Sequence, residues 1–312
     1  MLPASATPPA GISSSAAPSI PPASEEVPDP TVTLSDTPSA TPSDALTSVF
    51  SAAYTRLSEA LPHVTATVEP PCRGDGWLTA DGLAAGGEEL DAFLTRDDEQ
   101  LLRDYGERGR PEAVASLGLH RYAWPVCLLV TVPWFLLRRV PRLPAAAVSL
   151  HRARGRMTAW PTGFACLPDD PAAALPGAVA VADEEALRAW AREVLAEHLT
   201  PVLGAFRPRM RRGPRAVWGM ATDEVAEGLW HVAGLLGEAP RARRELELLL
   251  PGATPPYVGG ASFRTLSGTR GESFPTRDRA GCCLFYTLRP EDACLTCPRT
   301  SDAERIRRMS AS

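Results

Sequence analysis

Two amino acids are missing from this 312-residue chain: it contains no lysine and no asparagine, and isoleucine occurs only at positions 12, 20 and 306. Because every basic side chain other than histidine is therefore an arginine, a cluster of arginines is weaker evidence for a binding site here than in a chain that also uses lysine. The formal net charge is −5. A mildly acidic chain gives no reason to expect a nucleic-acid partner, since such a partner requires a basic surface.

Features of export and of membrane insertion are also missing. The N-terminus has neither the basic start nor the apolar core of a secretory signal. The longest apolar run, AWPVCLLVTVPWFLL at residues 123–137, is shorter than the ~20 residues of a membrane-spanning helix. Pro125 and Pro133 also interrupt it, so we expect a core segment and no transmembrane segment. We therefore expect a cytoplasmic protein, in which closely spaced cysteines are more often metal ligands or redox groups than disulfides.

The composition divides the chain into three parts. Residues 1–45 are dominated by Pro, Ser, Ala and Thr and contain no aromatic residue, so they cannot bury enough apolar surface to offset the entropy of ordering. We predict a disordered tail there, a mainly helical body at 46–281 and a cysteine-bearing segment at 282–312. Apolar periodicity of about 3.6 residues predicts helices within these ranges of the body: 48–64, 88–106, 183–201, 216–237 and 241–252, and a further helical segment that starts at 111 and leads into the apolar run at 123–137.

Two other stretches of the body break this helical pattern. Two short runs flank Arg154 and Gly155, which predicts a β-hairpin near 148–160. Residues 255–281 are rich in Gly, Ser and Pro and are expected to form a long loop. The predicted fold class is α+β: a mostly helical single domain with a small antiparallel β element and a C-terminal metal-binding motif.

Four of the seven cysteines lie in GCCLFYTLRPEDACLTCP at 281–298, with the spacing C-C-x10-C-x2-C. A tight turn can direct the sulfurs of Cys294 and Cys297 at one metal. Cys282 and Cys283 are adjacent, so their side chains diverge on a strand or a helix and cannot converge without local backbone distortion. A single tetrahedral zinc fits this spacing poorly. A [2Fe-2S] cluster, whose two irons take two thiolates each, fits better, and zinc binding and thiol redox or disulfide chemistry are the alternatives.

This motif resembles the [2Fe-2S] signature of the FhuF-like ferric siderophore reductases, in which an aromatic residue follows the vicinal pair and proline follows the last cysteine. Tyr286 and Pro298 occupy these places. Upstream, EHLTPVLGAF and AVWGMA resemble the H-L-x-P and L-W-G segments of the family around His198, Pro201 and Trp218, although Val217 replaces the usual leucine. The resemblance covers about the last third of the chain.

The resemblance implies that Cys282, Cys283, Cys294 and Cys297 hold a [2Fe-2S] cluster and that the protein reduces ferric iron carried by a siderophore. One electron converts Fe(III) to Fe(II), which hard oxygen ligands bind more weakly. The sequence contains no G-x-G-x-x-G after a predicted strand and no P-loop, so we expect an external electron donor: a ferredoxin, a flavodoxin or an NAD(P)H-dependent reductase. The alternatives are an iron-sulfur accessory protein of siderophore biosynthesis or transport, and a structural zinc-binding module without catalysis.

Arginines supply the candidate substrate contacts. Arg279 and Arg289, like Arg277 and Arg299, flank the cysteines and offer guanidinium groups to anionic chelate oxygens or to cluster sulfurs; the alternative is that they are solvated surface residues. The segment FRPRMRRGPR at 206–215 holds five arginines. It is interpreted either as a docking patch for an acidic electron donor or as an ordinary exposed loop between helices.

Overall fold

Helices carry most of the fold in the computed structural model of the chain, which describes residues 42–311. The α-helices are α1 Pro42–Ala60, α2 Ala80–Ala85, α3 Gly87–Tyr105, α4 Pro111–Leu137, α5 Glu184–Met210, α6 Pro214–Leu235, α7 Ala239–Leu249 and α8 Asp302–Ser310. The disordered tail predicted at 1–45 lies outside the described residues up to position 41. Its last residues belong to α1, which begins at Pro42, earlier than the predicted start at position 48.

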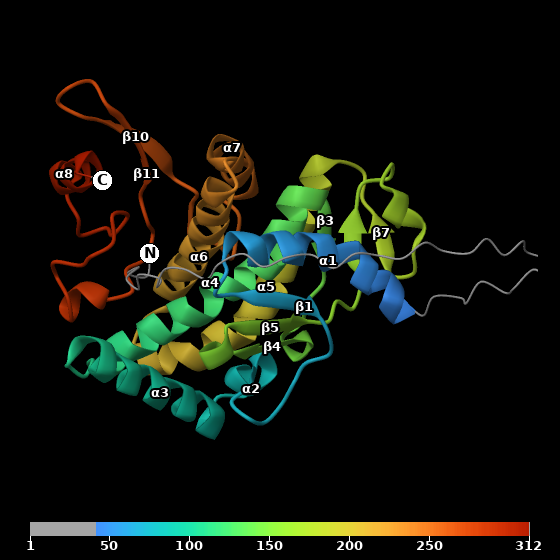
Figure 1. Cartoon of the computed structure of the whole chain (residues 1–312), viewed down its shortest axis with the longest axis horizontal. Coiled ribbons are helices and arrows are strands. Elements are labelled where there is room, and N and C mark those ends of the chain that lie inside the picture. Colours follow the sequence, from blue (N-terminus) through green and yellow to red (C-terminus); the bar gives the residue numbers. More distant parts are fainter. Residues whose placement is uncertain (1–41, 312) are drawn as a thin grey trace, which may run out of the picture. The chain divides into compact units, whose positions relative to one another are not determined.

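The helix α4 forms the centre of the core and packs against α1, α3, α5 and α6. Figure 1 shows α4 beside α5 and α6. Pro125 and Pro133 lie inside α4 and do not interrupt it, contrary to the expectation from the sequence. Pro133 cannot donate to the carbonyl of Leu129, and the Tyr54 hydroxyl donates to that carbonyl instead, at 3.0 Å. Packing on several sides and this replacement hydrogen bond keep the helix continuous.

Among residues 42–311, α4 is also the one helix that is long and apolar enough to cross a membrane. In the structure 78% of its most apolar window is buried inside the protein. The neighbouring helices already cover its apolar side chains, so α4 is a core helix.

Four small sheets complete the body, and their strands are β1 Thr65–Val68, β2 Leu78–Thr79, β3 Arg139–Pro141, β4 Val148–His151, β5 Arg156–Ala159, β6 Phe164–Cys166, β7 Ala178–Ala180, β8 Pro251–Gly252, β9 Gly259–Gly260, β10 Phe263–Ser267 and β11 Ser273–Arg277. The hairpin predicted near 148–160 is present as the antiparallel pair β4–β5, in which Val148 faces Ala159. Two of the sheets, β1-β5-β4-β2 and β3-β6-β7, also contain a parallel pair. The mostly helical α+β prediction is confirmed, at 56% helix with small antiparallel sheets.

The C-terminal third differs most from the expectation. Residues 255–281 are not one long loop, because they contain the antiparallel hairpin β10–β11. The helix α5 continues past Pro201 to Met210, so most of the expected loop at 206–215 consists of the end of α5 and the start of α6. After the cysteines, α8 begins at Asp302 with Ser301 as its N-cap. Figure 1 shows β10, β11 and α8 together on one side of the body, away from β3 and β7.

Candidate functional site

The vicinal cysteines follow a backbone segment that is held against α6. The Asp223 carboxylate accepts hydrogen bonds from the amide of Ala280 at 3.0 Å and from the amide of Gly281 at 2.6 Å. Gly281 lies so close to this helix that an added Cβ would come within 2.7 Å of Met220 Cγ. A larger residue at position 281 would therefore displace the segment from α6 immediately before Cys282.

Local backbone distortion is needed for two adjacent thiols to serve one site, and it occurs directly after the pair. Leu284 has a φ of +66°, a left-handed conformation that bulky side chains rarely adopt. Its amide donates to Cys282 Sγ at 3.4 Å. On the other side, Arg212 Nη1 donates to the carbonyl oxygen of Cys282 at 2.7 Å. The direction of this thiol is thus set by contacts on both sides of the residue.

Cys283 packs into apolar surroundings. It contacts a small cluster around Leu101, Val114 and Leu117 of α3 and α4. Burial raises the pKa of the Cys283 thiol to about 11, although the nearby Arg279 opposes the shift. A free thiol at this position is neutral at pH 7, so binding of a metal here would displace its proton.

The second cysteine pair forms a tight turn in which the amide of Cys297 donates to the carbonyl of Cys294 at 3.0 Å. The helix α8 holds this turn, because Arg305 Nη2 donates to the Cys297 carbonyl at 3.1 Å. The two thiols are hydrogen-bonded to each other. The hydrogen bond from Cys294 lowers the pKa of Cys297 to about 6, and the same interaction, followed by burial, raises the pKa of Cys294. Cys297 is therefore the thiol of this pair that loses its proton more readily.

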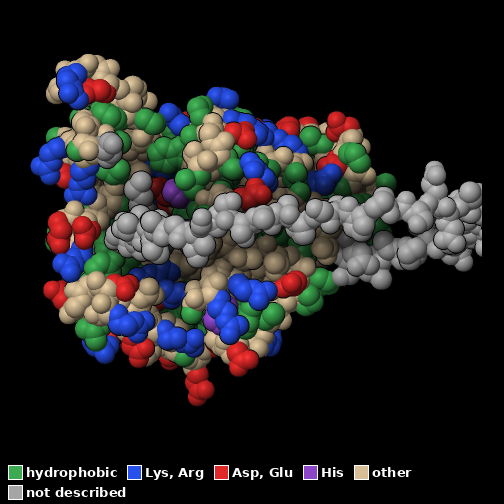
Figure 2. All heavy atoms as spheres, in the orientation of Figure 1, with side chains coloured by type: hydrophobic (Ala, Val, Ile, Leu, Met, Phe, Trp, Pro, Cys, Tyr) green, Lys and Arg blue, Asp and Glu red, His purple; other side chains and the backbone are tan. Residues whose placement is uncertain are grey.

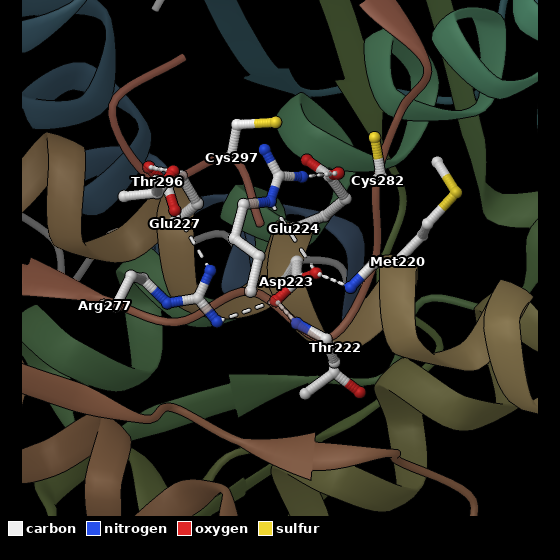
Figure 3. A network of polar contacts seen from close by, with 12 residues as sticks. Met220, Thr222, Asp223, Glu224, Glu227, Arg277, Cys282, Thr296 and Cys297 are labelled. Carbon is white, nitrogen blue, oxygen red and sulfur yellow. Dashed lines mark hydrogen bonds and ion pairs between the residues drawn. The ribbon is translucent and has the colours of Figure 1, made fainter. Parts of the chain in front are cut away.

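A buried network of acids and arginines lies beneath the cysteines. Asp223 and Glu224 have fully buried side chains on α6, and Glu227, one turn later, is 20% exposed. Arg277, also fully buried, donates to Asp223 at 2.8 Å and to Glu227 at 3.0 Å. Figure 3 shows these carboxylates with Cys282 and Cys297 on the same side of Asp223. Arg279 Nη2 donates to Glu224 Oε1 at 3.1 Å.

Two of the carboxylates respond differently to this environment. Burial raises the pKa of Asp223, against the opposing effects of the two guanidinium groups and the two backbone amides. For Glu224 burial acts in the same direction, but His120, whose Nδ1 lies 2.7 Å from Oε2, and Arg279 outweigh it, so that the pKa of Glu224 is lowered. The lowered pKa keeps Glu224 ionised beside Arg279.

Two side chains of this network reach a cysteine sulfur. Arg279 Nη1 lies 3.8 Å from Cys294 Sγ, within hydrogen-bond range for sulfur. The hydroxyl of Thr296 lies 3.9 Å from the same sulfur and 3.2 Å from Glu227 Oε1, and its single proton can be donated to either acceptor. Donors of this kind stabilise thiolates that bind iron.

The arginines predicted from the sequence occupy different environments. Arg277 and Arg279 are buried in ion pairs, so the interpretation as solvated surface residues is wrong for both. The Arg279 side chain is 4% exposed and faces Cys294, which assigns it to the sulfurs rather than to a ligand in solvent. Arg289 is 35% exposed and donates to the Tyr105 carbonyl at 3.0 Å. Arg299 lies over the ring of Tyr286.

The upstream residues of the resemblance lie in the helical body. His198 is buried in α5, 2.7 Å from the Tyr122 hydroxyl and 2.8 Å from the Leu143 carbonyl, and burial lowers its pKa to about 4. It is a neutral core histidine. Trp218 packs against Tyr257.

The donor chemistry of the four thiols fits a [2Fe-2S] cluster. Within residues 42–311, no three His, Cys, Asp or Glu side chains converge closely enough to hold one metal ion. The donor set of four cysteines with hydrogen-bond donors directed at Cys282 and Cys294 is the chemistry that a [2Fe-2S] cluster requires.

Sequence reasoning missed the acids beneath the cysteines. Asp223, Glu224 and Glu227 lie in a stretch that reads as an apolar, helix-compatible run. The available signal was the pair of adjacent acids at 223 and 224, flanked by residues that a core helix buries, because carboxylates are rarely buried without partners.

Comparison with known protein families identifies the segment that carries the cysteines. Residues 279–299 match the domain family described as the FhuF 2Fe-2S C-terminal domain. This confirms the resemblance for the segment that carries the four cysteines and implies a [2Fe-2S] cluster. The match does not extend to the segments around His198, Pro201 and Trp218, so it is shorter than the resemblance inferred from the sequence. No curated protein matches the chain.

Proposed function

We propose that this chain, which carries a FhuF-type [2Fe-2S] segment at 279–299, is a ferric siderophore reductase that acts in the cytoplasm. The observation that carries the proposal is the geometry of this segment: Asp223 of α6 holds the backbone before the first cysteine pair, Arg305 of α8 holds the second pair, and Arg279 lies against a sulfur. Cys282, Cys283, Cys294 and Cys297 would hold the cluster. When bound, it supplies a one-electron carrier.

The overall reaction transfers one electron from an external donor to an Fe(III)-siderophore complex. The donor is oxidised by one electron, and the iron is reduced to Fe(II), for which the hard oxygen ligands have a lower affinity. Cys282, Cys283 and Cys294 are each partly exposed, while Cys297 is buried. Partial exposure allows a donor and an acceptor to approach the sulfurs closely. Of the two arginines predicted to contact substrate, Arg279 is buried, so Arg289 is the one that we propose as a contact for an anionic siderophore.

We propose that the electron donor is an acidic protein, such as a ferredoxin or a flavodoxin, and that it docks at the junction of α5 and α6. Arg212 of this junction contacts the Cys282 carbonyl, so the junction adjoins the vicinal cysteines. Arg207, Arg211 and Arg215 are exposed there, and among the described residues none of the three forms an ion pair. On the face shown in Figure 2 basic and acidic side chains are interspersed.

Anaerobic purification followed by visible absorption, electron paramagnetic resonance after dithionite reduction, and iron, sulfide and zinc analysis tests the cofactor. A colourless protein with one zinc per chain would replace this proposal with the structural zinc module. The reduced protein is then mixed with ferric hydroxamates in the presence of a chromogenic Fe(II) chelator. Formation of Fe(II) at one equivalent per oxidised cluster supports the reductase. Cluster-loaded protein that forms no Fe(II) above the buffer background has the accessory role instead.

A further inference from the structure

We propose that Arg279 raises the reduction potential of the cluster by donating to the sulfur of Cys294, and that Glu224 and Asp223 are positioning residues for its guanidinium group. This inference rests on the [2Fe-2S] site and holds whether or not the reduced protein acts on siderophores. It concerns residues outside the cysteine ligand set.

Arg279 makes contacts on two sides of its guanidinium group. Nη2 donates to Glu224 at 3.1 Å, and Nε lies 3.6 Å from Asp223 in an ion pair. Nη1 is directed the other way, to Cys294 Sγ at 3.8 Å. The carboxylates therefore hold one side of the planar group and fix the direction of the other. A planar donor that is fixed in this way loses little side-chain entropy when it donates to a sulfur.

Arg279 also has donor capacity that the protein leaves unused. Its side chain is 4% exposed, and Nε has no hydrogen-bond partner among the described residues despite its burial. Buried N–H groups are usually paired, and an unpaired one requires a reason. Nε faces Asp223, whereas Nη1, on the other side of the group, is the nitrogen that reaches a thiol.

The direction of the effect follows from charge. Reduction adds one electron to the group held by the four thiolates, so a nearby cation stabilises the reduced state more than the oxidised state. Burial strengthens this difference because water screens the interaction less. Without Arg279, the carboxylates of Asp223 and Glu224 would face the sulfurs with less countercharge, which would disfavour reduction further.

Arg289 provides the matched control. It lies in the same matched segment, but its side chain is 35% exposed and its contacts are the Tyr105 carbonyl, the Tyr105 ring and Glu291. Exposed charges are screened by solvent and contribute little at a distance. Arg289→Gln removes the same charge from the same segment without touching the network.

The test is a redox titration of the cluster-loaded protein, followed by the visible absorption of the cluster and by the paramagnetic resonance signal of its reduced form. For Arg279→Gln we expect the equilibrium constant for one-electron reduction to fall about tenfold, which corresponds to 59 mV for a one-electron step. Arg279→Lys, which keeps the charge but not the fork, is expected to lose about threefold. Arg289→Gln is expected to stay within about twofold of the wild type.

The proposal fails if Arg279→Gln has the wild-type equilibrium constant for one-electron reduction. It also fails if Arg289→Gln lowers this constant as much as Arg279→Gln does. Removal of Arg279 alone leaves Glu224 without one of its partners, so the double variant Arg279→Gln/Glu224→Gln is titrated as well. We expect its equilibrium constant to fall less than that of Arg279→Gln, because a negative charge is removed together with the positive one. If neither Gln variant retains iron and sulfide, Arg279 is a structural residue and the proposal is overturned. Fe(II) formation from ferric hydroxamates is measured separately, so its absence with an intact Arg279 effect would contradict only the reductase assignment.

Discussion

Replacement of Asp223 by asparagine should release the cluster before it unfolds the protein. In the structure the Asp223 carboxylate accepts from Arg277 at 2.8 Å, from the Ala280 amide at 3.0 Å and from the Gly281 amide at 2.6 Å. Asparagine keeps one acceptor oxygen and presents an amide group to donors. The variant therefore loses the charge and at least one of these hydrogen bonds.

The magnitude follows from the partners that remain. Loss of one member of a buried ion pair costs about 3–5 kcal/mol when the other charge is left without compensation. Arg277 keeps Glu227 at 3.0 Å and the Ala261 carbonyl at 3.0 Å, which reduces the cost. A hydrogen bond to a charged group is worth about 1.5–3 kcal/mol. We expect Asp223→Asn to cost about 3 kcal/mol, which leaves a domain of ordinary stability folded.

The assay compares two properties of the cluster-loaded protein: its urea unfolding midpoint by circular dichroism, and the rate at which an iron chelator bleaches the cluster absorption. Asp97→Asn is the control, because the Asp97 side chain is also fully buried, on α3, and is paired with Arg121 and Arg152. Both variants should lower the unfolding free energy by similar amounts. Asp223→Asn should also lose its cluster at least about tenfold faster than Asp97→Asn, since 1.4 kcal/mol of local destabilisation gives that factor. Equal rates for the two variants would refute the role of Asp223 in holding the vicinal cysteines.

Three further predictions test the rest of the structure. Cys283→Ser should lose most of its iron and sulfide by chemical analysis, whereas Cys72→Ser should keep both; wild-type content in the Cys283 variant would remove it from the ligand set. Hydrogen bonding by a guanidinium group lowers the pKa of Asp170 in the folded state, so its contribution to stability exists above the unfolded pKa near 3.8 and is lost as the pH falls through the folded value. Asp170→Asn should therefore cost about 2 kcal/mol at pH 7 in urea unfolding, and this cost should begin to shrink only as the pH falls below the unfolded pKa of 3.8; a pH-independent cost would contradict this. The double reversal Arg211→Glu/Arg215→Glu should slow cluster reduction by an acidic ferredoxin several-fold at low salt and leave reduction by dithionite unchanged, as measured by stopped-flow absorption; equal slowing of both would exclude a docking effect.

Local signals in the sequence were sufficient for part of the fold. The hairpin at β4–β5 and the amphipathic α7 were predicted because turn chemistry and apolar periodicity act within a few residues. The hairpin β10–β11 was missed because it lies at the surface, where its side chains do not alternate between apolar and polar, and because β11 contains Pro275. The short polar helix α8 had a readable signal in the capping sequence that runs from Ser301 to Glu304, whose amide donates to Ser301 Oγ.

The features of the candidate site that the sequence predicted were also the local ones, and those that it missed depend on contacts between distant residues. The spacing of the four cysteines is a local property, and it identified both pairs. The pairing of Asp223 with Arg277 joins residues 54 positions apart, and nothing in one sequence indicates which of its many acids meets which of its many arginines. Pro125 and Pro133 led to the wrong expectation of an interrupted segment for a related reason, because the hydrogen bond that supports α4 is donated by Tyr54 of a different helix.

The doubled cysteine shows why the body of the protein must take part in cluster binding. A left-handed Leu284 costs about 1–2 kcal/mol, so a free peptide of this sequence would rarely hold its adjacent thiols in the required directions. Asp223 fixes the backbone immediately before Cys282, and Arg212 fixes the Cys282 carbonyl. Both come from the α5–α6 region, far from the cysteines in the sequence. The strain is therefore offset by tertiary contacts, and perturbation of α6 should reach the cluster more directly than perturbation of the segment's own exposed side chains.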